Sequence, residues 1–288
     1  MALPDFRKGF NITLTKLQMV ALENTCYVLG AGAFAVFVRW LQVTAGTNDE
    51  GLFNKTVWNV LVPLCIFVSL AIFFNMTRKL KKKRYYIDEN PAVALKNTGK
   101  LYGALRILIG GTMAVGGVLL ILACETDKHS VLQAIVGGLG VVSGTSFIWL
   151  LGAYNREDNN PNLLCLAASA PLLLFAVWII TTYKENDINS VVWAYGVEIV
   201  AMCVVLVAFF RLAGFAFGVV DFNHVHNTTM LGIFMLMLSL ADERYLGQQV
   251  MIIGGLCMLL YYDWLILTNM QQGEAPLSYQ PTDGFERL

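Results

Sequence analysis

Glu198 is the acidic residue that lies deepest inside an apolar run of the sequence. It follows Trp193 and Tyr195 and falls about eight residues into the segment Ser190–Phe210. At the 1.5 Å rise of an α-helix, the carboxyl group lies roughly 12 Å inside that segment. An unpaired charge in hydrocarbon costs several kcal/mol, so Glu198 is a candidate for proton or cation coupling. The alternative is a protonated or hydrogen-bonded carboxyl group with a packing role.

A second group of polar side chains occupies the segment Asp221–Thr229, which contains two of the three histidines of the chain. On a helix, two sets of these side chains each share one face: Asp221, His224 and Thr228, and Asn223, His226 and Asn227. A histidine one turn from a carboxylate can relay protons near neutral pH, or bind a cation or a substrate carboxylate. We expect this segment to line a pocket; the alternative is a polar interfacial segment solvated by headgroup water. His224 and His226 point in nearly opposite directions, so a helix does not bring both to one metal ion.

Four more charged residues lie near the ends of apolar runs, and three of them, Glu23, Arg106 and Asp263, are further candidates for a binding or coupling role. Glu23 and Arg106 each lie about one turn inside their runs on the same side, so they could form an ion pair. Arg106 can instead extend its guanidinium group to the headgroups. Asp263 lies near the end of the last run, and Arg39 belongs to the opposite rim. A structural role is the alternative for each of them.

A run of basic residues followed by Tyr85 and Tyr86 is the most conspicuous polar feature of the chain. We call it the basic cluster, and its members are Arg78, Lys79, Lys81, Lys82, Lys83 and Arg84. Basic residues beside a helix end attract anionic lipid at about 1 kcal/mol each, and tyrosine favours the headgroup zone. We expect the cluster to determine topology through nonspecific contact with anionic headgroups. A specific lipid or phosphate site is the alternative.

The elements that must position these residues are long apolar segments. The chain has 288 residues, of which 57% are hydrophobic and 14% charged, whereas a soluble domain carries about 25% charged residues. This composition, with 20 basic and 20 acidic residues, excludes a soluble enzyme, a disordered protein and a nucleic-acid binder. A helix needs about 20 apolar residues to cross a bilayer. Eight runs meet that need: Met19–Thr44, Thr56–Met76, Leu101–Cys124, Val131–Ala153, Asn162–Tyr183, Ser190–Phe210, Val220–Ala241 and Leu246–Met270.

These runs predict an all-α, polytopic membrane protein with eight transmembrane helices. Strands are not expected, because transmembrane strands alternate strictly between apolar and polar residues over about 10 positions. The seventh run is the least apolar, since its dense part, Met230–Ala241, has only 12 residues. We expect a cytoplasmic segment 1–18, a transmembrane domain 19–270 with a basic cytoplasmic loop 77–100, and a disordered cytoplasmic tail 271–288.

The distribution of basic residues predicts the orientation of the chain. With the N-terminus inside, the inner side collects 14 basic residues and the outer side collects 4, namely Lys55, Lys128, Lys184 and Arg244. Both termini are therefore expected in the cytoplasm, and the helices form four hairpins that close on the outside. We expect a multi-pass protein of the plasma or inner membrane.

Glycine pairs spaced four apart suggest two features of the helices. Gly140 and Gly144 form a small-residue face, for which we expect close packing of the third and fourth helices. Gly214 and Gly218 suggest a flexible or broken link before the seventh helix.

Function is the least determined property of the sequence. The leading hypothesis is a transporter-like or channel-like protein for a small solute, proton-coupled through Glu198 and the Asp221/His224 segment. The second is a sensor or scaffold subunit that acts through a partner protein or a homo-oligomer. The third is an inner-face lipid-processing enzyme that uses Asp221, His224 and Asp263. The sequence contains no metalloprotease, nucleophile-elbow or phosphate-loop motif, so an enzyme is disfavoured and neither cofactor nor metal is expected.

Overall fold

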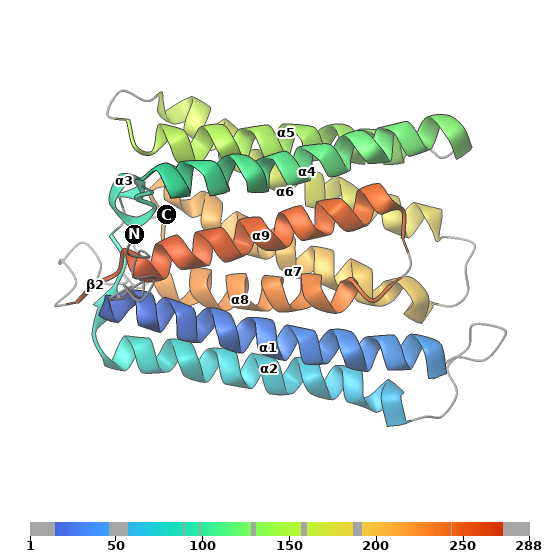
Figure 1. Cartoon of the computed structure of the whole chain (residues 1–288), viewed down its shortest axis with the longest axis horizontal. Coiled ribbons are helices and arrows are strands. Elements are labelled where there is room, and N and C mark those ends of the chain that lie inside the picture. The colour runs from blue at the N-terminus through green and yellow to red at the C-terminus, as the bar shows by residue number, and fades with distance from the viewer. Residues whose placement is uncertain are drawn as a thin grey trace, which may run out of the picture.

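The structure is a computed structural model, and it describes residues 15–45, 57–88, 90–97, 99–127, 131–156, 160–186, 192–242 and 244–272. Eight long helices run side by side along a common axis (Figure 1). They are α1 (Lys16–Ala45), α2 (Val57–Lys82), α4 (Lys100–Asp127), α5 (Val131–Ala153), α6 (Pro161–Glu185), α7 (Val192–Phe217), α8 (Phe222–Ser239) and α9 (Leu246–Thr268). α1 begins and α9 ends at the same end of the bundle, which we call the terminal end; the opposite end is the distal end.

Seven of these helices are long and apolar enough to cross a membrane, all except α8. The chain therefore has the architecture of an all-α, multi-pass membrane protein, as the sequence predicts. Large apolar side chains such as Phe34, Phe67 and Leu166 are exposed on the outside of the bundle. In water such a surface would be unfavourable, whereas hydrocarbon solvates it.

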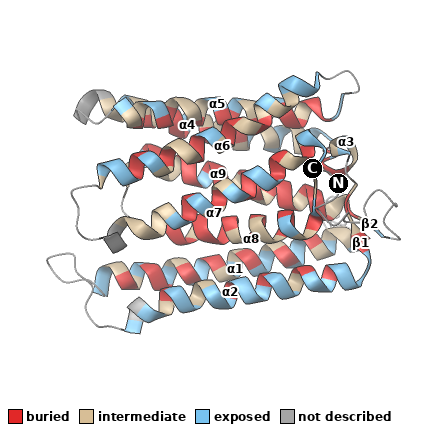
Figure 2. Cartoon of the chain, turned by 180° about the vertical axis from the view of Figure 1, so that it is seen from behind, coloured by how far each residue is buried: buried red, intermediate tan, exposed pale blue. Residues whose placement is uncertain are grey.

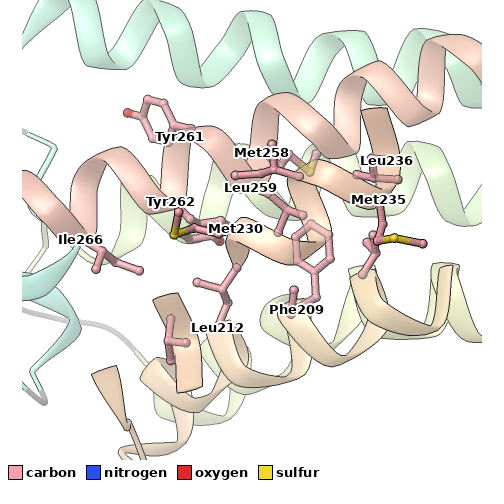
Figure 3. Packing of buried hydrophobic residues seen from close by; sticks show 14 of the residues in the cluster. Phe209, Leu212, Met230, Met235, Leu236, Met258, Leu259, Tyr261, Tyr262 and Ile266 are labelled. Carbon is pink, nitrogen blue, oxygen red and sulfur yellow. The ribbon is translucent and has the colours of Figure 1, made fainter. Parts of the chain in front are cut away.

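α8 lies in the interior of the bundle, which explains why it needs less apolar surface than its neighbours. It packs against α1, α2, α7 and α9, and most of its side chains are buried (Figure 2). Figure 3 shows part of this core, where Phe209 of α7, Met230 of α8 and Leu259 of α9 lie together. A helix with this many protein neighbours can carry polar groups that a lipid-facing helix cannot.

Close packing of α4 against α5 is confirmed, and it depends on glycine. A Cβ atom on Gly117 would lie 2.3 Å from the Gly137 carbonyl oxygen, and one on Gly144 would lie 2.3 Å from the Gly110 carbonyl oxygen. The backbones of the two helices are thus in direct contact, as small residues permit in membrane helices. Gly140 contributes to the same contact, because a Cβ atom on it would lie 3.4 Å from Gly117 Cα of α4, and it also faces the Met251 side chain of α9.

We expect Gly117→Ala to lower the free energy of unfolding by about 1–3 kcal/mol, because the added methyl group overpacks a contact between two backbones. Gly111→Ala on the same helix is the matched control, since a Cβ there meets no atom within 4 Å. Its effect should stay within about 0.5 kcal/mol. Equilibrium unfolding in mixed detergent micelles measures both variants. Equal stabilities of the two would contradict the glycine-dependent contact.

Two predicted helix ends differ from the structure. α2 continues six residues past Met76 to Lys82, so the basic cluster begins on the helix instead of in a loop. α7 continues past Phe210 to Phe217 and contains Gly214, so the predicted break is wrong at that position. The helix ends because Gly218 adopts φ 70°, and the Val219 amide then donates to the Gly214 carbonyl at 2.9 Å. That left-handed conformation is the usual way in which glycine ends a helix.

The described residues between α2 and α4 contact the end of α9. They include a two-residue strand β1 (Tyr85–Tyr86), which pairs antiparallel with β2 (Gln271–Gln272), and a short helix α3 (Pro91–Ala94). The Asn269 amide donates to two carbonyl groups of the same segment, those of Ala94 and Lys96. The first two residues of the predicted disordered tail are therefore a strand, whereas 273–288 lie outside the described residues.

Candidate functional site

Four charged side chains form a continuous series of ion pairs at the distal end of the bundle. Arg39, near the end of α1, donates from Nε to Asp242 Oδ1 at 2.8 Å, and Asp242 lies in the connection between α8 and α9. Asp242 Oδ2 accepts from Arg244 Nη2 at 3.1 Å, and Arg244 Nε lies 3.5 Å from Glu198 Oε2 on α7. We call these four residues the distal cluster. It links α1, α7 and the α8–α9 connection by side chains alone.

Glu198 is positioned by α6 as well as by Arg244. Its Oε1 atom accepts hydrogen bonds from Trp178 Nε1 at 3.0 Å and from Thr182 Oγ1 at 3.2 Å. Trp178 and Thr182 are four residues apart on α6, so they present both donors on one helix face. The carboxyl group is therefore hydrogen-bonded on one oxygen and faces a guanidinium group with the other.

The distal cluster is buried and formally neutral. The side chains of Arg39, Arg244, Asp242 and Glu198 are only 2%, 4%, 9% and 12% exposed. Buried charges are tolerated only when they are paired, because their desolvation costs several kcal/mol each. Two cations and two anions satisfy that condition together, although Arg244 Nε and Nη1 are buried donors with no hydrogen-bond partner among the described residues.

A second buried pair lies about one helical turn inside the terminal end. His226 of α8 and Asp263 of α9 meet at 2.7 Å between Nδ1 and Oδ1, and their side chains are 0% and 3% exposed. We call them the buried pair. Phe222, one turn before His226 on α8, stacks on the imidazole ring with centroids 5.6 Å apart.

The buried pair is flanked by polar atoms with unused hydrogen-bonding capacity. His226 Nε2 and Thr229 Oγ1 are both buried and have no hydrogen-bond partner among the described residues. When the Asp263 carboxylate accepts a hydrogen bond from the Nδ1–H group of His226, the neutral imidazole has its lone pair on Nε2. That lone pair can accept a proton, and the adjacent carboxylate would stabilise the resulting imidazolium.

Asp221 and His224 form a separate pair on the surface of the terminal end. Asp221 is the N-cap of α8, where its side chain accepts from the Asn223 amide, and it contacts His224 Nδ1 at 2.7 Å. Burial alone raises the pKa of Asp221, but the bonds from His224 and the Asn223 amide outweigh it and the pKa is lowered. Both side chains are at least half exposed. This geometry is that of a helix cap.

The structure does not bring Glu198 and the Asp221/His224 segment together. Glu198 lies near the start of α7 and Asp221 follows its end, so the length of the helix, roughly 28 Å, separates them. Glu198 and the Asp221/His224 segment therefore do not share one site. Asp263 contacts His226 and not His224, so the predicted inner-face set of Asp221, His224 and Asp263 is not one site either.

The predicted pair of Glu23 and Arg106 does not form between these two described residues. Glu23 is exposed on α1, whereas Arg106 of α4 lies against α5, with Nη1 2.9 Å from the position of a Cβ on Gly152. The physical reason is the helix arrangement, since α4 packs mainly on α5 and α9, and α1 packs on α2, α8 and α9.

Sequence reasoning missed the residues that complete each site. Asp242 and Arg244 follow an apolar run in a short connection, and nothing in the local sequence predicts that they are buried. Thr229 carries no charge and gave no signal of its own. The sequence did separate the polar residues of α8 into two helix faces, one with His224 and one with His226. The face with His226 is the buried one.

The chain matches no known protein family, no curated protein and no solved structure. Within the described ranges, no group of three or more His, Cys, Asp or Glu side chains could hold a metal ion. Function is therefore inferred from the side chains of the two buried sites.

Proposed function

We propose that the chain is a proton-coupled, transporter-like membrane protein for a small solute. The observation that carries the proposal is the buried pair, a titratable imidazole and a carboxylate in the interior of the bundle. Ionisable groups inside a membrane domain are costly, and they are retained where they serve ion or proton pathways. The free lone pair of His226 Nε2 and the unpartnered Thr229 hydroxyl provide a place for a proton or a polar solute group.

The proposal includes a topology of eight membrane helices with both termini in the cytoplasm. The terminal end is then cytoplasmic, as the 14 to 4 distribution of basic residues favours. The helices form four hairpins that close on the outside of the plasma or inner membrane. α8, with 18 residues, is about 27 Å long, so it spans most of the hydrocarbon while protein neighbours bury its polar residues His226, Thr229 and Ser239.

In this topology the distal cluster acts as the outer gate. It joins α1, α7 and the α8–α9 connection through ion pairs, and such pairs can exchange partners when helices move. A buried ionic network adds little net stability compared with apolar packing, so a switching role is a reason for its presence. Glu198 is thereby assigned to the gate, and proton binding is assigned to the buried pair.

The test uses purified protein in proteoliposomes that contain a pH-sensitive dye. Carboxylates, amino acids, amines and sugars are added outside in turn, and proton movement is followed. We expect one class of solute to drive proton movement in protein-containing vesicles and not in empty ones. Proton movement that is the same in both kinds of vesicle for every class would contradict the proposal.

A second candidate function is a sensor or scaffold subunit that acts through a partner protein. The observation that favours it is the segment 85–97 at the terminal end, which the β1–β2 ladder and Asn269 attach to α9. A partner bound to this segment would receive movements of α9 directly. Co-purification of a stoichiometric partner in mild detergent, lost on Asn269→Ala, would support this candidate over transport.

A further inference from the structure

A groove runs along the outside of the bundle between α2 and α8. It is lined by Leu70, Phe73, Phe74, Asn227, Thr228 and Leu231, and it has a volume of about 160 Å³. Leu70 and Phe74 are exposed on its α2 side, so the groove opens toward the surrounding lipid. Its lining is almost entirely apolar, which suits an acyl chain.

The end of the groove nearest the terminal end carries polar groups. Thr77 Oγ1 on α2 donates to Asn227 Oδ1 on α8 at 2.6 Å. That bond fixes the orientation of the amide. The Asn227 Nδ2 group has no recorded partner among the described residues, so it remains a donor at the head of the groove.

The basic cluster continues directly from this polar end. Arg78 lies with its Cζ atom 4.1 Å from the centroid of the Phe74 ring, one helical turn further along α2. This cation–π contact places the guanidinium group beside Phe74, which lines the groove. Lys81 and Lys82 follow at three and four residues from Arg78 on the same side of the helix, and both are exposed.

We propose that this groove is a binding site for an anionic phospholipid. One acyl chain lies between α2 and α8, and the phosphate group binds at Arg78 and Asn227 Nδ2 with Lys81 and Lys82 around it. Guanidinium groups bind phosphate through charge-assisted hydrogen bonds. The cationic group of a zwitterionic lipid would be repelled by the three basic side chains, Arg78, Lys81 and Lys82. The site therefore favours anionic over zwitterionic phospholipids. The proposal requires only that the chain lies in a membrane and is independent of transport.

The test measures lipid binding to the full chain by native mass spectrometry in mild detergent, with phosphatidylglycerol or phosphatidylcholine added. We expect one phosphatidylglycerol to bind in preference to phosphatidylcholine. Arg78→Gln should weaken that binding at least about tenfold. Leu231→Trp, which fills the groove and leaves every charge in place, should weaken it comparably.

The matched control is Lys83→Gln, which removes one charge of the same basic cluster at an exposed residue that follows the end of α2 and does not line the groove. It should leave phosphatidylglycerol binding within about twofold of the wild type. Equal losses for Arg78→Gln and Lys83→Gln would overturn the proposal in favour of nonspecific attraction. Unchanged binding in Arg78→Gln, or equal binding of the two lipids to the wild type, would overturn it as well.

Discussion

Asp242→Asn should lower the free energy of unfolding by about 3–5 kcal/mol, the cost of breaking a buried ion pair by removing one partner. The substitution keeps the size of the side chain and removes only its charge. Arg39 and Arg244 then both lose the Asp242 carboxylate as an ion-pair partner. Both are at least 96% buried, so water cannot compensate for the missing charge.

Equilibrium unfolding in mixed detergent micelles measures this loss. Glu23→Gln is the control, because it makes the same change of charge on an exposed position of α1, and it should alter stability by no more than about 0.5 kcal/mol. A double-mutant cycle with Arg39→Gln isolates the Arg39–Asp242 contact, for which we expect a coupling of about 2 kcal/mol or more. Additive effects would show that the four charges do not act as a network.

His226→Gln should reduce proton-coupled solute movement in proteoliposomes at least about tenfold, because removal of a positioned acid–base group typically costs 10²–10⁴-fold in proton transfer. Glutamine has a similar length and can still donate to Asp263, so the bundle should remain folded. Asp263→Asn should have a similar effect, since the amide cannot stabilise an imidazolium.

His224→Gln is the matched control for His226→Gln. It makes the same substitution two residues earlier on α8, at a side chain that is 61% exposed. Flux should remain within about twofold of the wild type, as for a surface position outside the pathway. Equal losses in the two histidine variants, or full activity of His226→Gln, would remove the buried pair from the mechanism.

The helices and their class could be predicted from the sequence because length and apolar composition alone determine them. Seven of the eight predicted runs correspond to helices able to cross a membrane, and the close α4–α5 contact follows from Gly144 as expected. The ends of the helices were harder to predict from the sequence, because α2 continues through Arg78 and α7 continues through Arg211. A basic residue on an exposed helix face can reach the headgroups, so it does not end a helix.

The pairing of charged residues could not be predicted, because it depends on which helices become neighbours. Arg39 and Asp242 are 203 residues apart in the chain, and no local pattern joins them. His224 and His226 are similar in sequence context, yet only His226 faces α9. The position of Asp263 on that neighbour decides which histidine is buried and paired, and this information exists only in the packed bundle.

The most direct measurement is the reactivity of a cysteine at position 229, beside the buried pair. Thr229→Cys is made in a variant without the six native cysteines, reconstituted in proteoliposomes and treated with a membrane-impermeant thiol reagent. We predict labelling that accelerates when Asp242→Asn is added and the outer gate is weakened. Ile233→Cys, one turn further along α8 and equally buried, should react far more slowly. If Thr229→Cys is as unreactive as Ile233→Cys from both sides, with or without Asp242→Asn, no water path reaches the buried pair and transport through this bundle is contradicted.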